Sequence, residues 1–186
     1  MKKIFILARK EFFSYFESPL GYLVVALFPA LACALFLLVT NALFSVNNAS
    51  LLGFFSNMPI ICALLCPAMT MKVWAEEFRA GTDECLLTLP VTVFQLVVGK
   101  FFGVFSVFVF ALACSIALPI GVASLGDLDW GPVWGGYFAT MVLGASSIAI
   151  SCFISAVSSS QIIAWLLSMS FLLTIFFFVL FLNLLG

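Results

Sequence analysis

Residues 22–44 have the sequence YLVVALFPALACALFLLVTNALF, without a single charged side chain. A membrane-spanning α-helix needs about 20 mostly apolar residues, so this stretch is long enough to cross a bilayer. The pattern continues beyond it, because no Lys, Arg, Asp or Glu occurs between Glu17 and Lys72. Polar residues at 45–50 divide this uncharged region, which therefore predicts a first span at about 22–44 and a second at about 53–72.

The composition of the whole chain agrees with a membrane protein. Of its 186 residues, 65% are hydrophobic and only 8% are charged, whereas about a quarter of a typical soluble domain is charged. The net charge of −1 gives no basis for a nucleic-acid partner, which needs a basic surface. The chain has no histidine, the commonest general base and metal ligand. We therefore expect an all-α integral membrane protein that is not an enzyme and has no catalytic, cofactor or metal site.

Three more spans are predicted in the second half of the chain. Apolar stretches run at about 99–121, 133–156 and 162–182, separated by short polar segments. The sequence thus predicts five spans in a single membrane domain over residues 1–186. The longest connection, residues 73–98, lies between the second and third spans.

The basic residues predict the orientation of these spans. Positively charged loops remain in the cytoplasm, and the seven basic residues are Lys2, Lys3, Arg9, Lys10, Lys72, Arg79 and Lys100. A cytoplasmic N-terminus puts all of them inside and leaves only Asp127 and Asp129 outside. The N-terminus itself, residues 2–18, is predicted to form an amphipathic helix along the inner leaflet, with Lys3, Lys10, Ser14 and Glu17 on its polar face and Pro19 ending it.

The predicted spans contain no acidic or basic residue at depth. Ion-coupled carriers use such groups despite their cost, so a secondary transporter is disfavoured. A nucleotide-binding P-loop is also absent, because Gly99-Lys100 is preceded by Phe94 at the first glycine position and followed by Phe101 in place of the hydroxyl residue. Small residues instead repeat at helical spacing at Gly136, Thr140, Gly144, Ser147, Ser151 and Ser155. They predict a helix-packing face, with a polar strip along a substrate path as the alternative.

Residues 74–91, WAEEFRAGTDECLLTLPV, concentrate charge in the connection after the second span. Thr82 is suited to cap a short helix, Asp83 and Glu84 complement the dipole of its first turn, and Pro90 ends it. The leucines of this helix would be costly in water, so we expect them to rest on a partner or on the bilayer surface. A solvated loop that only maintains the topology is the alternative.

Three stretches of the chain resemble the membrane subunits of type-2 ABC transporters, and most closely the gliding-motility permease subgroup. They are AEEFRAGTDECLLTLPV (75–91), RKEFFSYFESPLGY (9–22) and SAVSSSQIIAW (155–165). In that family the first stretch is the coupling helix, which docks on a separate ATPase subunit. The positions that match are Glu76, Glu77, Arg79, Gly81, Thr82, Glu84, Leu86, Leu87, Thr88, Leu89 and Pro90. The family has six spans, so the five predicted here imply a chain without the sixth.

The resemblance implies a permease subunit of an ABC transporter, of the exporter type, in the bacterial inner membrane. Its implied partners are an ABC ATPase, which binds the ATP and Mg²⁺, a second permease copy and membrane lipid. A non-transporting scaffold that anchors a cytoplasmic partner and a truncated, non-functional permease remain as alternatives. The uncharged, aromatic-rich spans fit a hydrophobic cargo, but they fit plain lipid-facing surface equally well.

Overall fold

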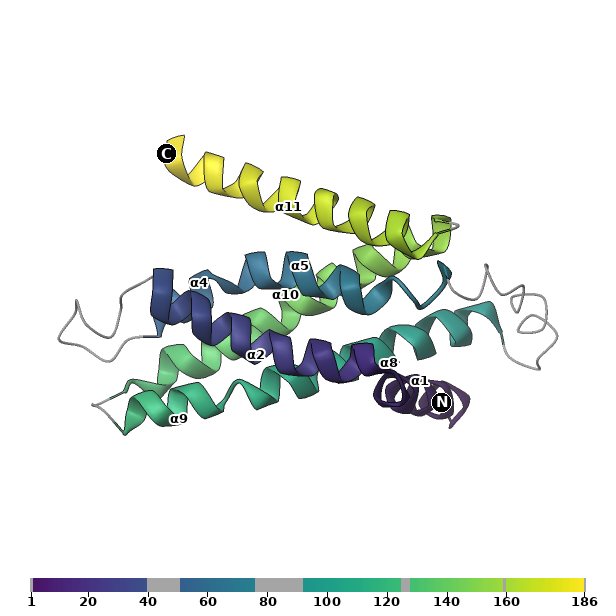
Figure 1. Ribbon diagram of the computed structural model, residues 1–186, viewed down its shortest axis with the longest axis horizontal. Coiled ribbons are helices and arrows are strands. Elements are labelled where there is room, and N and C mark those ends of the chain that lie inside the picture. Colours follow the sequence, from purple (N-terminus) through teal and green to yellow (C-terminus); the bar gives the residue numbers. More distant parts are fainter. Residues whose placement is uncertain (1, 40–50, 76–91, 125–127, 159, 186) are drawn as a thin grey trace.

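The computed structural model describes residues 2–39, 51–75, 92–124, 128–158 and 160–185, which Figure 1 shows as an elongated bundle. The predicted all-α fold is confirmed, because the described residues form helices and no strand. In chain order the helices are α1 (Lys2–Glu17), α2 (Pro19–Val39), α4 (Leu52–Ser56), α5 (Met58–Thr70), α8 (Val93–Cys114), α9 (Ala117–Ala123), α10 (Trp130–Val157) and α11 (Gln161–Leu185).

Helix α1 runs across the other helices, and Figure 1 shows it nearly end-on while the rest of the bundle lies lengthwise. It packs mainly on α8 and also contacts α2. Two glycines of α8 allow this approach: a Cβ on Gly99 would lie 2.7 Å from the Cβ of Leu7, and one on Gly103 would overlap the Cβ of Glu11. A helix that runs across membrane-spanning helices in this way has the orientation of a helix lying along a membrane surface.

A sharp corner joins α1 to α2. Ser18 separates the two helices, and Pro19 occupies the first position of α2, where its missing N–H is not needed. The N–H of Gly21 donates to the carbonyl oxygen of Ser18 at 3.1 Å. A Cβ on Gly21 would overlap the carbonyl oxygen of Tyr15, so the corner requires a residue without a side chain at this position.

Four helical stretches among the described residues are long and apolar enough to cross a membrane. They are Gly21–Leu38, Val93–Ala123, Trp130–Val157 and Gln161–Leu185. The second predicted span, 53–72, is instead divided into α4 and the shorter apolar helix α5, which meet at Asn57. Pro59 explains the division, because it has no N–H to donate to the carbonyl of Phe55 and so interrupts the hydrogen-bond ladder.

The third predicted span, 99–121, begins earlier in the structure. Thr92 and Gln95 form a capping box, in which each side chain accepts from the backbone N–H of the other. This cap starts α8 at Val93, so Lys100 lies about two turns inside the helix and not at its entrance.

A break at residues 115–116 separates α8 from α9. Pro119 cannot donate to the carbonyl of Ser115, which ends the regular ladder there. The hydroxyl of Ser115 donates to the carbonyl of Leu112 at 2.7 Å and lies 3.2 Å from the hydroxyl of Tyr137 on α10. The break is therefore tied to the neighbouring helix.

Helices α10 and α11 extend slightly beyond their predicted ranges of 133–156 and 162–182. The side chain of Asp129 caps α10 by accepting from the N–H of Gly131 at 3.0 Å. Helix α11 packs on α5 and α10, but its buried residues are confined to its first half. Figure 1 shows α11 diverging from the bundle toward the C-terminus.

Pairs of phenylalanine rings fill the centre of the bundle. Phe28 of α2 meets Phe108 of α8 edge-to-face at 5.5 Å between ring centroids. Phe36 of α2 meets Phe54 of α4 in the same way at 6.1 Å. All four side chains are almost completely buried, and edge-to-face contacts of this kind are a favoured arrangement of aromatic rings.

Candidate functional site at the α1 end of the bundle

The predicted ATPase-contact residues lie outside the described residues. These are Glu76, Glu77, Arg79, Gly81, Thr82, Glu84, Leu86, Leu87, Leu89 and Pro90, all within 76–91. The structure does place both flanks of this segment, at Ala75 after α5 and at Thr92 before α8. Figure 1 shows that the end of α5 and the start of α8 lie at the same end of the bundle as α1, here called the α1 end.

The flank on the α5 side is a short non-helical stretch, residues 71–74, here called the exit turn. Its N–H groups continue to bond backward: Met71 donates to Pro67 and Val73 donates to Thr70, each at 3.0 Å. Val73 is buried, and so is the following Ala75. The exit turn is thus packed against the bundle until it reaches residue 76.

A tyrosine of α1 holds the last turn of α5. The side chain of Tyr15 is buried, and its hydroxyl donates to the carbonyl oxygen of Met69. Carbonyl groups in the last turn of a helix have no partner within the helix. The Tyr15 hydroxyl supplies one, so the crossing helix α1 is attached directly to the end of α5.

A lysine of α8 holds the exit turn. The Nζ atom of Lys100 donates to the carbonyl oxygen of Val73 at 2.6 Å and lies 4.2 Å from the ring centroid of Trp74. Only 2% of this lysine is exposed. The ammonium group combines a charge-assisted hydrogen bond, a cation–π contact and the negative end of the α5 dipole. Together these interactions compensate the burial of its charge.

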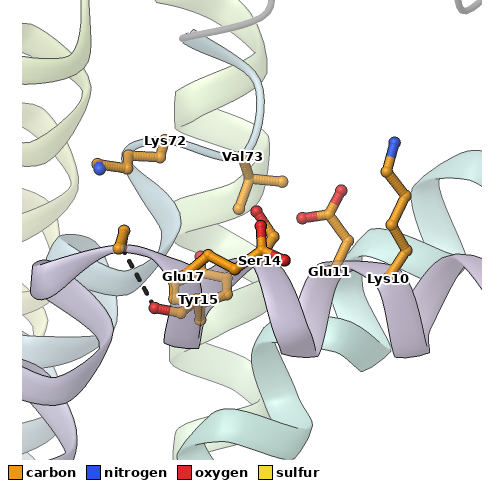
Figure 2. Close-up of a pocket in the computed structure, with 8 residues that line it drawn as sticks. Lys10, Glu11, Ser14, Tyr15, Glu17, Lys72 and Val73 are labelled. Carbon is orange, nitrogen blue, oxygen red and sulfur yellow. Dashed lines mark hydrogen bonds between the residues drawn. The ribbon is translucent and has the colours of Figure 1, made fainter.

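A cleft of about 420 Å³ lies between α1 and the exit turn. Its described lining is mostly polar and consists of Lys10, Glu11, Ser14, Tyr15, Glu17, Ser18, Lys72 and Val73. Figure 2 shows the side chains of Lys10 and Glu11 projecting from α1 on the side where Lys72 and Val73 lie. The α1 end therefore carries charges of both signs beside the point where residues 76–91 begin.

The second set of predicted site residues lies on one face of α10. Gly136 faces Phe55, whose ring a Cβ would approach to 2.5 Å, and a Cβ on Gly144 would overlap the ring of Phe108. The hydroxyl of Thr140 donates to the carbonyl of Gly136 at 2.8 Å, and that of Ser147 donates to the carbonyl of its own helix at Leu143. Small residues on this face of α10 thus allow the neighbouring helices to approach closely.

Ser151 and Ser155 continue this face toward the α1 end and are completely buried. Within the part of the chain that the structure describes, their hydroxyl oxygens make no hydrogen bond. No group of three or more Cys, Asp or Glu residues in that part is arranged to hold a metal ion.

A comparison with protein families matches residues 5–185 to the family described as ABC-2 family transporter protein. The match covers nearly the whole chain. This chain belongs to the ABC-2 transporter family. A search of curated proteins found no match to it.

Membership of the ABC-2 family gives the bundle its general role. The chain is an integral membrane protein and the permease component of an ABC transporter. A membrane component of this family is not itself catalytic, and the family implies an ABC ATPase as its partner.

Two residues of this ABC-2 permease were not predicted to belong to the site. The sequence placed Lys100 among the basic residues of the cytoplasmic side and at the start of the span predicted at 99–121, and it gave Tyr15 no role beyond its place in the helix predicted at 2–18. The Thr92-x-x-Gln95 pattern is a capping-box signal that places Lys100 inside a helix. For Tyr15 there was no signal, because its partner Met69 is 54 residues away in the sequence and bonds through its backbone.

Proposed function

We propose that this chain is the permease subunit of an exporter-type ABC transporter, and that a separate ATPase docks on residues 76–91. Hydrolysis of ATP would occur in that partner, which would bind both ATP and Mg²⁺. One observation carries the proposal: both flanks of residues 76–91, the end of α5 and the start of α8, lie at the α1 end, where the charged cleft and the crossing helix also lie. The sequence resemblance supports the exporter type and the gliding-motility subgroup.

The proposed location is the bacterial inner membrane, with the α1 end in the cytoplasm. The basic residues Arg9 and Lys10 of α1, Lys72 after α5 and Lys100 in the first half of α8 belong to that end, whereas Asp129 caps α10 at the opposite end. An excess of basic residues is typical of cytoplasmic segments. A dimer with a second copy, surrounded by lipid, is also proposed, and the exposed apolar side chains along α11 support it.

We expect a membrane-impermeant maleimide to label Cys85 in inside-out vesicles and not in intact cells. Cys85 is the cysteine that the sequence puts outside the apolar stretches, in the proposed cytoplasmic segment. Labelling is followed by the mass shift of the purified protein, and a Cys85→Ser variant gives the background. Labelling of Cys85 from outside intact cells would reverse the proposed orientation.

Glu84→Lys is expected to weaken binding of the ATPase subunit about ten- to hundred-fold. The change would replace an attraction to a basic partner residue with a repulsion and would oppose the helix dipole, a combined effect of about 1–3 kcal/mol. The measurement is co-purification of a co-expressed ABC ATPase at equal permease levels. A gene for such an ATPase next to the permease gene would identify the subunit to co-express.

Two further variants complete this experiment. Replacing Leu86 and Leu87 together by alanine removes apolar contacts and is expected to weaken binding without reversing a charge. Asp127→Lys is the control, because it reverses an acidic residue that lies between α9 and α10 in the sequence and belongs neither to residues 76–91 nor to the described lining of the cleft. If the Glu84 and leucine variants both retain the ATPase, residues 76–91 are only a topological link.

A further inference from the structure

Lys100 lies outside residues 76–91, so the proposed docking of the ATPase does not account for a lysine at this position. It lies on α8, yet its ammonium group reaches the exit turn that follows α5, 27 residues earlier in the sequence. A methionine or leucine could fill the same buried space without the cost of burying a charge. A buried lysine at this place is therefore expected to do something that packing alone would not do.

Two of the groups that Lys100 contacts lie shortly before residues 76–91 in the sequence. It bonds to the carbonyl of Val73 and lies against the ring of Trp74, and Ala75 is the last described residue of this flank. The exit turn is not part of α5, so its backbone lacks the regular ladder that makes a helix stiff. If no side chain held the exit turn, the turn would deform when residue 76 is displaced, and the displacement would not reach α5 or α8.

Two further contacts at the α1 end attach α1 to the helices on either side of residues 76–91. Tyr15 attaches α1 to the carbonyl of Met69, one turn before Val73. Gly99 and Gly103, which flank Lys100 on α8, are in close contact with Leu7 and Glu11 of α1. Helices α1, α5 and α8 are thus connected to one another within a few residues of Lys100.

We propose that Lys100 is a positioning residue that fixes the exit turn to α8, so that a displacement applied to residues 76–91 moves α5 and α8 together. The proposal rests on the proposed function, because it assumes that an ATPase displaces that segment. The lysine acts by holding backbone and ring groups and takes no part in a chemical step. Among these contacts, that of Lys100 joins α8 to the exit turn after α5, and thus links the two flanks of residues 76–91.

The first test measures the attachment in the permease alone. Amide hydrogen exchange of residues 71–75 is followed by mass spectrometry in lipid nanodiscs. Lys100→Met is expected to accelerate this exchange about ten-fold, because the Val73 carbonyl loses its donor and the Trp74 ring its cation. Lys100→Arg is expected to restore most of the protection. Lys72→Met, which removes a half-buried lysine from the exit turn itself, is the control and is expected to change exchange less than two-fold.

The second test measures transmission in the complex with the ATPase. A spin label at Ile120→Cys, an exposed position on α9 at the far end of the bundle, reports movement when ATP is added. Native cysteines are replaced by serine or alanine in this background. Lys100→Met is expected to leave co-purification and ATP hydrolysis near wild-type levels but to reduce the ATP-dependent change at residue 120 several-fold.

The outcomes separate this inference from the proposed function. Failure of the wild-type permease to bind the ATPase would contradict the proposed function, while the exchange experiment would still test the attachment. Unchanged exchange at residues 71–75 in Lys100→Met, or an unchanged response at residue 120, would overturn the role of Lys100. If Lys100→Met does not fold, Trp74→Leu replaces it in both experiments, and the same unchanged results would count against the proposal.

Discussion

Gly21→Ala is expected to lower the midpoint of thermal unfolding of the detergent-solubilised protein by about 6–12 °C. The added Cβ would overlap the carbonyl oxygen of Tyr15, which belongs to the backbone and cannot rotate away. The corner between α1 and α2 would have to open, at a cost of about 3 kcal/mol, the upper end for overpacked sites. For a chain of this size each kcal/mol shifts the midpoint by about 2–4 °C.

The control for this prediction is Gly121→Ala. Gly121 lies in α9, and a Cβ added there would meet no atom within 4 Å. Alanine has a higher helix propensity than glycine, so this variant is expected to be as stable as the wild type or more stable by up to about 1 kcal/mol. An equal loss of stability in both variants would show that the corner is not the cause.

Gly144→Leu is expected to have the second largest effect, a loss of about 2–3 kcal/mol with partial separation of α10 from α8. A Cβ on Gly144 would already overlap the ring of Phe108, and leucine adds three more carbon atoms. The ring cannot easily move aside, because it is completely buried and packs edge-to-face on Phe28. The measurement is the midpoint of thermal unfolding, together with the fraction of monodisperse protein after solubilisation.

Gly135→Leu gives a matched comparison on the same helix. Gly135 is exposed and a Cβ there would have no neighbour within 4 Å. The same side chain is therefore added to α10 in both variants, once against α8 and once on the open face. If Gly135→Leu is as destabilised as Gly144→Leu, the loss reflects leucine in the helix and not the contact with Phe108.

The positions of the helices could be predicted because apolar stretches of sufficient length have few alternatives in a membrane. The interruptions were harder to place. Prolines lie beside both of them, because α8 ends shortly before Pro119 and Pro59 is the second residue of α5. Counting apolar residues does not detect a missing N–H donor, so the predicted span over 53–72 was drawn as continuous although the structure divides it at Asn57.

The contacts at the α1 end could not be predicted for a different reason. Tyr15 and Lys100 both donate to backbone carbonyl oxygens, of Met69 and Val73. Any residue type offers the same carbonyl group, so the acceptor leaves no trace in the sequence. The pairing becomes visible only when the crossing direction of α1 and the early start of α8 are known.

The crossing of α1 over α8 also has a consequence for biosynthesis. The glycines that receive α1, Gly99 and Gly103, lie about 90 positions after it in the chain. At translation rates of about 5–20 residues per second, they leave the ribosome roughly 5–20 s after α1. Until then α1 lacks α8, its main packing partner, and its amphipathic character allows it to rest on the lipid surface. The first helix to be synthesised therefore completes its native contacts only after Gly103, more than halfway along the chain, has left the ribosome.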